Sequence, residues 1–91
     1  MKELIQRNYD AVVARKLISE STTDKQFWEK LSEEYDEVYQ PYMKRDRKEL
    51  SKELTDVIVV CINWLTHMGF DIPKLLEQNA IKNEERVKHG L

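Results

Sequence analysis

Apolar residues recur along this chain every three or four positions, which is the spacing of amphipathic α-helices. The first segment carries Ile5, Tyr9 and Val12 on one side, and a later segment carries Phe27, Leu31 and Val38. Capping residues and helix breakers divide this pattern into helices over about residues 2–19, 24–40, 47–68 and 72–88. The chain is therefore predicted to be all-α, as a four-helix bundle-like unit with short loops between antiparallel neighbours.

Short-range signals give the predicted helix boundaries. Thr23 and Gln26 have the spacing of a capping box, in which each side chain satisfies a free backbone amide of the other. Pro41 is expected to end the helix before it, because the residue preceding a proline disfavours the α conformation. Gly69 is the expected C-terminal cap of the third helix. The remaining predicted helix starts are Asp46 and Asp71-Ile72-Pro73.

The segment 47–68 is the most apolar of the four. Its Val57–Val60 run is also compatible with a strand, but the composition of residues 48–56 favours a helix throughout. We expect this helix to be the most buried, because apolar residues cover most of its circumference. Its main stripe consists of Leu50, Leu54, Ile58, Cys61, Leu65 and Met68.

Size and composition add to this picture. The chain has 91 residues and a mass of 10.9 kDa, so residues 1–91 are interpreted as a single domain. Hydrophobic residues make up 41% and charged residues 35% of the chain, which is typical of a globular domain with a highly charged surface. A core of this size is thin, so assembly into a symmetric oligomer is expected to bury further surface.

Charge and cysteine content exclude several classes of protein. The single cysteine, Cys61, rules out an internal disulfide framework and a multi-cysteine zinc site. The net charge of −2 argues against general nucleic-acid binding, so no nucleic acid partner is expected. No apolar run is long enough to span a membrane, and the Met1–Leu4 start lacks the apolar stretch of a signal peptide. A cytoplasmic protein without a membrane partner is therefore expected.

Carboxylates interrupt the apolar stripe of the second helix. Glu34 occupies a position between Leu31 and Val38 that should face the core, and Glu37 follows one turn later. The third helix repeats this arrangement with Glu53 and Asp56, which border its apolar face. Two antiparallel helices can bring these four acids together, where a hard divalent cation such as Mg²⁺ would relieve their repulsion. A solvated acidic surface is the alternative interpretation.

The order of these motifs resembles that of the MazG-like, all-α nucleoside triphosphate pyrophosphohydrolases. Residues 33–37 fit a Glu-Glu-x-x-Glu motif, Glu53-Leu54-Thr55-Asp56 fits a Glu-x-x-Asp motif, and Lys82 and Arg86 follow on the last helix. The resemblance covers roughly residues 10–88 of the chain. It implies a dimeric or tetrameric enzyme that uses Mg²⁺, or Mn²⁺ as a substitute, to cleave a nucleoside triphosphate into the monophosphate and pyrophosphate.

The resemblance also implies roles for individual residues. Glu33 is expected to support the metal ligands or to orient water, and Glu34 is the candidate for activating the water. The last helix would face the phosphates with Lys82, Asn83 and Arg86. Trp64 shares a face with the acids and is the candidate for stacking on a nucleobase. The metal ligands implied by the motifs are Glu34, Glu37, Glu53 and Asp56.

Two other functions remain open at this stage. Phosphoribosyl-ATP pyrophosphohydrolase uses the same kind of helical unit for related chemistry. A non-catalytic helical module that binds a protein partner would not need the acids to hold a metal. His67 is interpreted as a partly buried or interface residue, and Lys44–Lys48 as a solvated basic loop.

Overall fold

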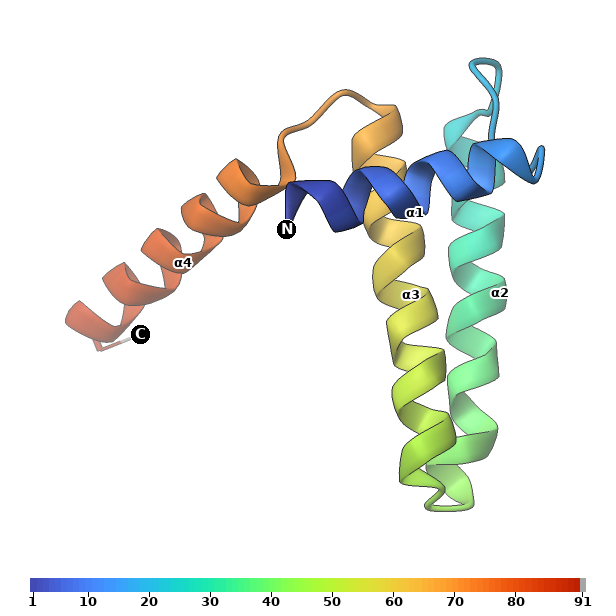
Figure 1. Ribbon diagram of the computed structural model, residues 1–91. Coiled ribbons are helices and arrows are strands. Elements are labelled where there is room, and N and C mark those ends of the chain that lie inside the picture. Colours follow the sequence, from blue (N-terminus) through green and yellow to red (C-terminus); the bar gives the residue numbers. More distant parts are fainter. Residues whose placement is uncertain (91) are drawn as a thin grey trace.

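The computed structural model describes residues 1–90 and contains four α-helices and no strand within that range. The helices are α1 (Lys2–Ala14), α2 (Asp24–Met43), α3 (Arg47–His67) and α4 (Ile72–Lys88). The all-α prediction is confirmed, and Val57–Val60 lies inside α3. As Figure 1 shows, α2 and α3 form a long antiparallel hairpin, α1 crosses the hairpin near one end, and α4 extends away from it.

The predicted starts of the last three helices are confirmed by their caps. The Thr23 hydroxyl accepts a hydrogen bond from the Gln26 backbone, and the Gln26 side chain accepts one from the Thr23 backbone, which completes the capping box. Asp46 accepts from the Glu49 amide at 3.1 Å, and Asp71 accepts from the Lys74 amide at 3.4 Å. Each cap is encoded within three residues, which is why it could be predicted.

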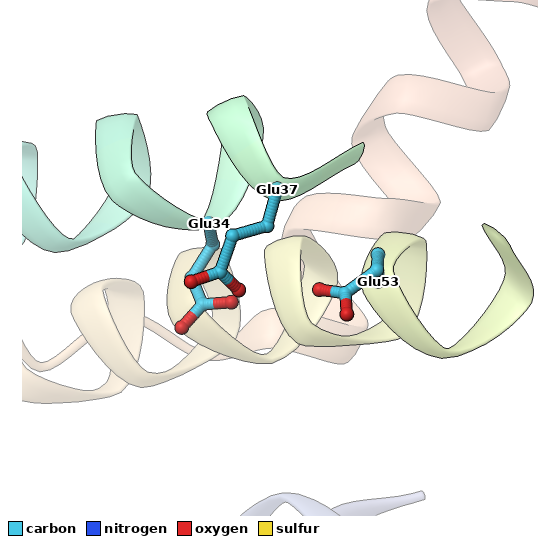
Figure 2. A group of neighbouring side chains, drawn as sticks. All are labelled: Glu34, Glu37 and Glu53. Carbon is cyan, nitrogen blue, oxygen red and sulfur yellow. The ribbon is translucent and has the colours of Figure 1, made fainter. Parts of the chain in front are cut away.

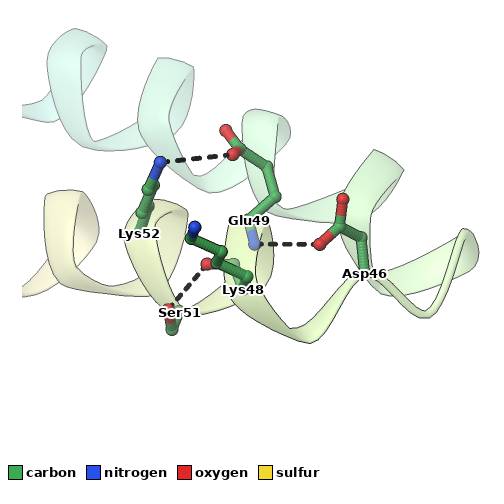
Figure 3. A network of polar contacts seen from close by, with 5 residues as sticks. All are labelled: Asp46, Lys48, Glu49, Ser51 and Lys52. Carbon is green, nitrogen blue, oxygen red and sulfur yellow. Dashed lines mark hydrogen bonds and ion pairs between the residues drawn. The ribbon is translucent and has the colours of Figure 1, made fainter.

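The α2–α3 turn carries a small polar network (Figure 3). Besides the Asp46 cap, Lys52 pairs with Glu49 at 4.0 Å and the Ser51 hydroxyl donates to the Lys48 carbonyl at 2.7 Å. These side chains are exposed, so the network contributes little to stability. Its structural role is to begin α3 immediately after the turn, which sets α3 antiparallel to α2.

Two predicted helix ends are wrong. The first helix ends at Ala14 and not near residue 19, because Lys16 adopts a left-handed conformation with φ of 62°. The second helix continues through Pro41 to Met43 and stops at Arg45, which has φ of 55°. Pro41 lies in the last turn, so it removes one hydrogen bond near the helix end, and its ring is buried.

The helices α1, α2 and α3 end in the same hydrogen-bonding motif. After α2, the Asp46 amide donates to the Pro41 carbonyl at 3.0 Å and the Arg45 amide to the Tyr42 carbonyl at 3.2 Å. Equivalent pairs of bonds follow α1 around Lys16 and α3 around Gly69. Gly69 has φ of 87° and is the cap that the sequence predicted, whereas Lys16 and Arg45 take this conformation with a side chain.

The apolar core is thin, as expected for a chain of this size. The buried apolar residues among residues 1–90 are Ile18, Phe27 and Ile72. The expectation that α3 is the most buried helix is confirmed for partial burial, because every residue from Val57 to His67 except Ile58 is half-buried or buried. Full burial is limited to Asn63, and Leu54 and Ile58 on the predicted main stripe are 46% and 55% exposed. The helix α4 extends away from the hairpin and makes little contact with α3 (Figure 1).

His67 joins three parts of the chain at the crossing of α1 over the hairpin. Its Nδ1 lies 3.1 Å from the Tyr9 hydroxyl on α1, and its Nε2 lies 2.9 Å from the Thr22 carbonyl in the α1–α2 connection. Its ring also packs against Phe27 of α2, with centroids 5.1 Å apart. His67 is therefore a partly buried structural residue, as its position in the sequence suggested.

Candidate metal centre and adjoining cavity

Three glutamates from the two hairpin helices converge in the middle of the hairpin. Glu34 and Glu37 lie one turn apart on α2, and Glu53 faces them from α3 (Figure 2). One carboxylate oxygen from each residue lies within 4.8 Å of the others. This convergence follows from the antiparallel hairpin, because the i, i+3 spacing directs both α2 acids toward the partner helix.

The cluster contains carboxylate oxygens that are removed from water. Glu34 is 8% exposed, in agreement with its predicted place on the core-facing stripe. Its Oε1 accepts an ion pair from Lys30 Nζ at 3.0 Å, while its Oε2 is buried without a hydrogen-bond partner among residues 1–90. Glu53 Oε2 is buried and unpartnered in the same way. Buried carboxylate oxygens are costly unless a cation or a donor compensates them.

The pKa values in the cluster also indicate that the acids lack a compensating positive charge. The pKa of Glu37 is raised above its ordinary value, first by the charge of Glu34 and then by burial. The pKa of Glu53 is raised mainly by burial and further by the charges of Asp56 and Glu49. Hydrogen bonding to Glu34 raises the pKa of Lys30, so this lysine remains charged beside the acids.

These residues fit a hard divalent cation. Mg²⁺ prefers oxygen ligands and is commonly bound through a small number of carboxylates together with water and substrate phosphates. The three glutamates offer several oxygens over a short span, and two buried oxygens have no hydrogen-bond partner within residues 1–90. A cation here would satisfy those oxygens and reduce the repulsion that raises the two glutamate pKa values.

Asp56 and Glu33 lie beside this cluster. Asp56 is exposed on α3, and its charge contributes to the raised pKa of Glu53, but it is not among the three acids that converge. Glu33 is exposed and lies 3.8 Å from Lys30 Nζ. Both residues line the cavity described below. Their roles as a metal ligand and a supporting acid remain predictions.

The predicted phosphate-binding residues lie elsewhere in this chain. Lys82, Asn83 and Arg86 are exposed on the second half of α4, which extends away from the hairpin (Figure 1). Asn83 Nδ2 donates to Asn79 Oδ1 on the same helix at 3.1 Å. A single chain in this conformation does not bring these residues to the acids, so their role in binding phosphate remains a prediction.

Trp64 has protein partners for both its ring and its ring nitrogen. Its indole stacks on Phe27 with centroids 5.8 Å apart and an interplanar angle of 6°. Its Nε1 donates to Asp24 Oδ1 at 2.8 Å. One face of the indole is therefore occupied by Phe27, and nucleobase stacking on Trp64 remains a prediction.

A cavity of about 530 Å³ adjoins the acids between the hairpin and the α1–α2 connection. The lining residues that were not identified from the sequence include Arg15, Lys30 and Asn63. Lys30 could have been identified from the sequence, because it precedes Glu34 by one turn on the same helix. Arg15 and Asn63 could not, because their places in the cavity depend on how α1 and α3 pack against α2.

No described helix combines the length and apolar character that crossing a membrane requires. No curated protein and no solved structure shows a significant match to the chain. The family model of the MazG nucleotide pyrophosphohydrolase domain matches residues 22–91, which include the hairpin, the acids and α4. The resemblance inferred from the acidic motifs is thereby confirmed, and the chain belongs to the MazG nucleotide pyrophosphohydrolase domain family.

Proposed function

We propose that this protein is a Mg²⁺-dependent nucleoside triphosphate pyrophosphohydrolase that releases a nucleoside monophosphate and pyrophosphate. The observation that carries this proposal is the convergence of Glu34, Glu37 and Glu53, with two buried and unpartnered oxygens, inside a MazG domain. Removal of unsuitable nucleotides from the cytoplasmic pool is the proposed biological role. Both ribonucleotides and deoxyribonucleotides are candidate substrates.

The acids would hold the cation through Glu34, Glu37, Glu53 and Asp56, and Mn²⁺ is the proposed substitute for Mg²⁺. When bound, such a cation supplies positive charge to the phosphate oxygens and lowers the pKa of water. Glu34 is proposed to accept a proton from the attacking water, because it lines the cavity and also belongs to the acid cluster that would hold the cation. Glu33 is proposed to hold Lys30 in place from the exposed side.

The protein's own cations are proposed to bind the phosphates. Lys30 and Arg15 line the cavity beside the acids, so they are available to a triphosphate that enters there. Lys82, Asn83 and Arg86 would join them if α4 of the same or a second chain packs over the acids. Arg86 would suit two phosphate oxygens, because a guanidinium presents paired donors, whereas Lys82 would act as a mobile point charge.

A homodimer or homotetramer is proposed as the working form. Support comes from large apolar side chains that remain exposed on two helices, such as Leu54 and Ile58 on α3 and Leu76 and Ile81 on α4. Exposed apolar patches of this kind are typical of surfaces that associate. Light scattering at micromolar concentration should give a multiple of 10.9 kDa, and a fully active monomer would contradict this part of the proposal.

The decisive experiment identifies the products. Purified protein is incubated with each common nucleoside triphosphate and Mg²⁺ in ¹⁸O-labelled water, and the products are separated by anion-exchange chromatography. Monophosphate and pyrophosphate are expected, in equal amounts, from the parent protein and not from Glu53→Gln. Diphosphate and orthophosphate as the main products, or equal activity in the variant, would contradict the proposal. The position of the label shows which phosphorus the water attacked.

A further inference from the structure

The cavity beside the acids contains a buried amide that the fold does not satisfy. Asn63 is 4% exposed, it lines the cavity, and its Oδ1 has no hydrogen-bond partner among residues 1–90. A buried polar group without a partner costs about 1–3 kcal/mol. A leucine at this position would pack against the surrounding apolar residues without that cost. The folding of the hairpin therefore does not explain why an asparagine occupies this position.

The register of the hairpin places this amide at the opposite end of the cavity from the acids. Glu34 lies near Glu53, and Phe27 stacks on Trp64, so α2 and α3 run past each other in a fixed antiparallel register. Asp56 and Asn63 are seven residues apart on α3, which is two turns, or roughly 10 Å along one helix face. The cavity thus extends from carboxylates at one end to an amide at the other.

The two ends differ in chemistry. At the acid end, Glu33, Glu34 and Asp56 line the cavity together with Lys30. Toward the amide end, the lining includes the buried apolar residues Phe27 and Ile18 together with the polar residues Thr22 and Gln26. The volume of about 530 Å³ lies within the range of small-molecule sites. A ligand that matches both ends carries phosphates on one side and a flat, hydrogen-bonding ring on the other.

We propose that Asn63 binds the edge of the nucleobase while the phosphates lie toward the acids. This inference rests on the proposed function for the identity of the ligand, a nucleotide. An amide offers one donor group and one acceptor, and nucleobase edges present donors and acceptors side by side. Asn63 is itself 4% exposed, so water competes little for its amide, which makes an unmatched amide costly and a matched one favourable.

The test compares ligands with and without a base. Binding of AMP, CMP, GMP, UMP and ribose 5-phosphate is measured by isothermal titration calorimetry in the presence of Mg²⁺. Asn63→Leu should weaken binding of the best-bound monophosphate by about 10-fold or more, because the base edge loses its partner. Binding of ribose 5-phosphate should change by less than about twofold, since it has no base to lose contact with.

Stability provides a second readout that a structural role would not give. Because the amide has no protein partner, Asn63→Leu should melt at the same temperature as the parent or higher. Asn8→Leu, the same chemical change at an exposed position on α1, is the matched control and should leave monophosphate binding unchanged. Asn63→Ala serves as a second variant in case the leucine side chain prevents folding, and it should show the same selective loss of base-dependent binding.

The outcomes separate this inference from the proposed function. The role of Asn63 is overturned if the parent binds monophosphates no better than ribose 5-phosphate. It is also overturned if both Asn63 variants bind monophosphates as the parent does. Either result would count against Asn63 even when triphosphates are hydrolysed. The inference is likewise overturned if the variants lose both ligands equally, because that pattern indicates a structural role or a site for an ordered water. A selective loss of monophosphate binding supports it, even if no triphosphate is hydrolysed and the proposed function fails.

Discussion

Trp64 at the end of α3 donates a hydrogen bond to Asp24, the first residue of α2, over a distance of 2.8 Å. The same indole stacks on Phe27, one turn further along α2. Together these contacts connect the open end of the hairpin, opposite the Asp46 turn. They also set the register of α2 against α3, and this register determines which acids meet.

Trp64→Phe should therefore lower stability. The phenylalanine ring can still stack on Phe27 but cannot donate to Asp24, so the free energy of unfolding should fall by about 1 kcal/mol. Urea unfolding measures this change. Trp28→Phe is the matched control, because Trp28 is 61% exposed and its replacement should change stability by less than about 0.5 kcal/mol. Equal effects of the two variants would show that the Trp64–Asp24 bond is not formed in solution.

Glu53→Gln should separate metal binding from folding. The variant removes one charge from a repulsive cluster, so in EDTA it should be as stable as the parent or more stable by on the order of 1 kcal/mol. Millimolar Mg²⁺ should raise the melting temperature of the parent by mass action and raise that of the variant much less. Glu77→Gln on α4 is the control. A full Mg²⁺ response in Glu53→Gln would show that Glu53 is not a metal ligand.

The raised glutamate pKa values predict how the metal-free protein responds to pH. Burial and neighbouring acids raise the pKa values of Glu37 and Glu53 above 4.5 in the folded state. The folded state therefore binds more protons than the unfolded state just above that pH. The resulting stability is complete below pH 4.5 and is lost as the pH rises through the raised values.

Melting temperatures in EDTA between pH 4.5 and 7 check this sign. The difference between the parent and Glu37→Gln should shift in favour of the parent as the pH falls, because only the parent gains a proton at residue 37. In samples with Mg²⁺ instead of EDTA, protons compete with the metal for the same carboxylates, so the stabilisation of the parent by Mg²⁺ should weaken as the pH falls. A difference between the two proteins that stays constant with pH would contradict the prediction.

Arg45→Gly should stabilise the protein. Arg45 caps α2 with φ of 55°, a conformation that strains residues with a β-carbon and that glycine adopts freely. We expect a gain of about 1 kcal/mol or less, because glycine also makes the unfolded chain more flexible. Thermal unfolding measures it. Arg47→Gly, at the first position of α3, is the contrasting control and should not stabilise the protein, because this residue already has a helical conformation.

Arg86→Ala tests the role of α4 in catalysis. If Arg86 binds the phosphates of the transition state, kcat/KM should fall about 10-fold or more, which corresponds to roughly 1.4 kcal/mol. The fold should persist, because Arg86 is exposed near the end of α4. Steady-state kinetics with light scattering on the same samples shows whether the loss accompanies a change in assembly. Parental kcat/KM in the variant would make Arg86 an ordinary surface residue.

The features predicted correctly from the sequence depend on neighbouring residues. The caps at Thr23, Asp46 and Asp71 act within three positions, and the position of Glu34 follows from the helical period of Phe27 and Leu31. Burial of Glu34 was therefore predictable before its partners were known. The convergence with Glu53 also followed, because a short turn makes α2 and α3 antiparallel.

The features that were predicted wrongly or missed depend on packing or on rare backbone conformations. Lys16 ends α1 in a left-handed conformation that lysine seldom adopts, so no residue type signalled the end. The direction of α4 depends on how it packs against α3, which the apolar pattern of α4 does not encode even though Ile72 is buried. Asn63 looked like one polar residue in an apolar run, and only the register of the hairpin reveals that it lines the cavity.

The Tyr9–His67–Thr22 contacts give the cavity wall a property that a salt bridge would not provide. When the imidazole is neutral, Nε2 donates to the Thr22 carbonyl and Nδ1 accepts from the Tyr9 hydroxyl. Neither bond needs a net charge on its partners, so salt does not screen them as it screens an exposed ion pair. The attachment of the α1–α2 connection to α1 and α3 through this one ring should therefore persist at high ionic strength.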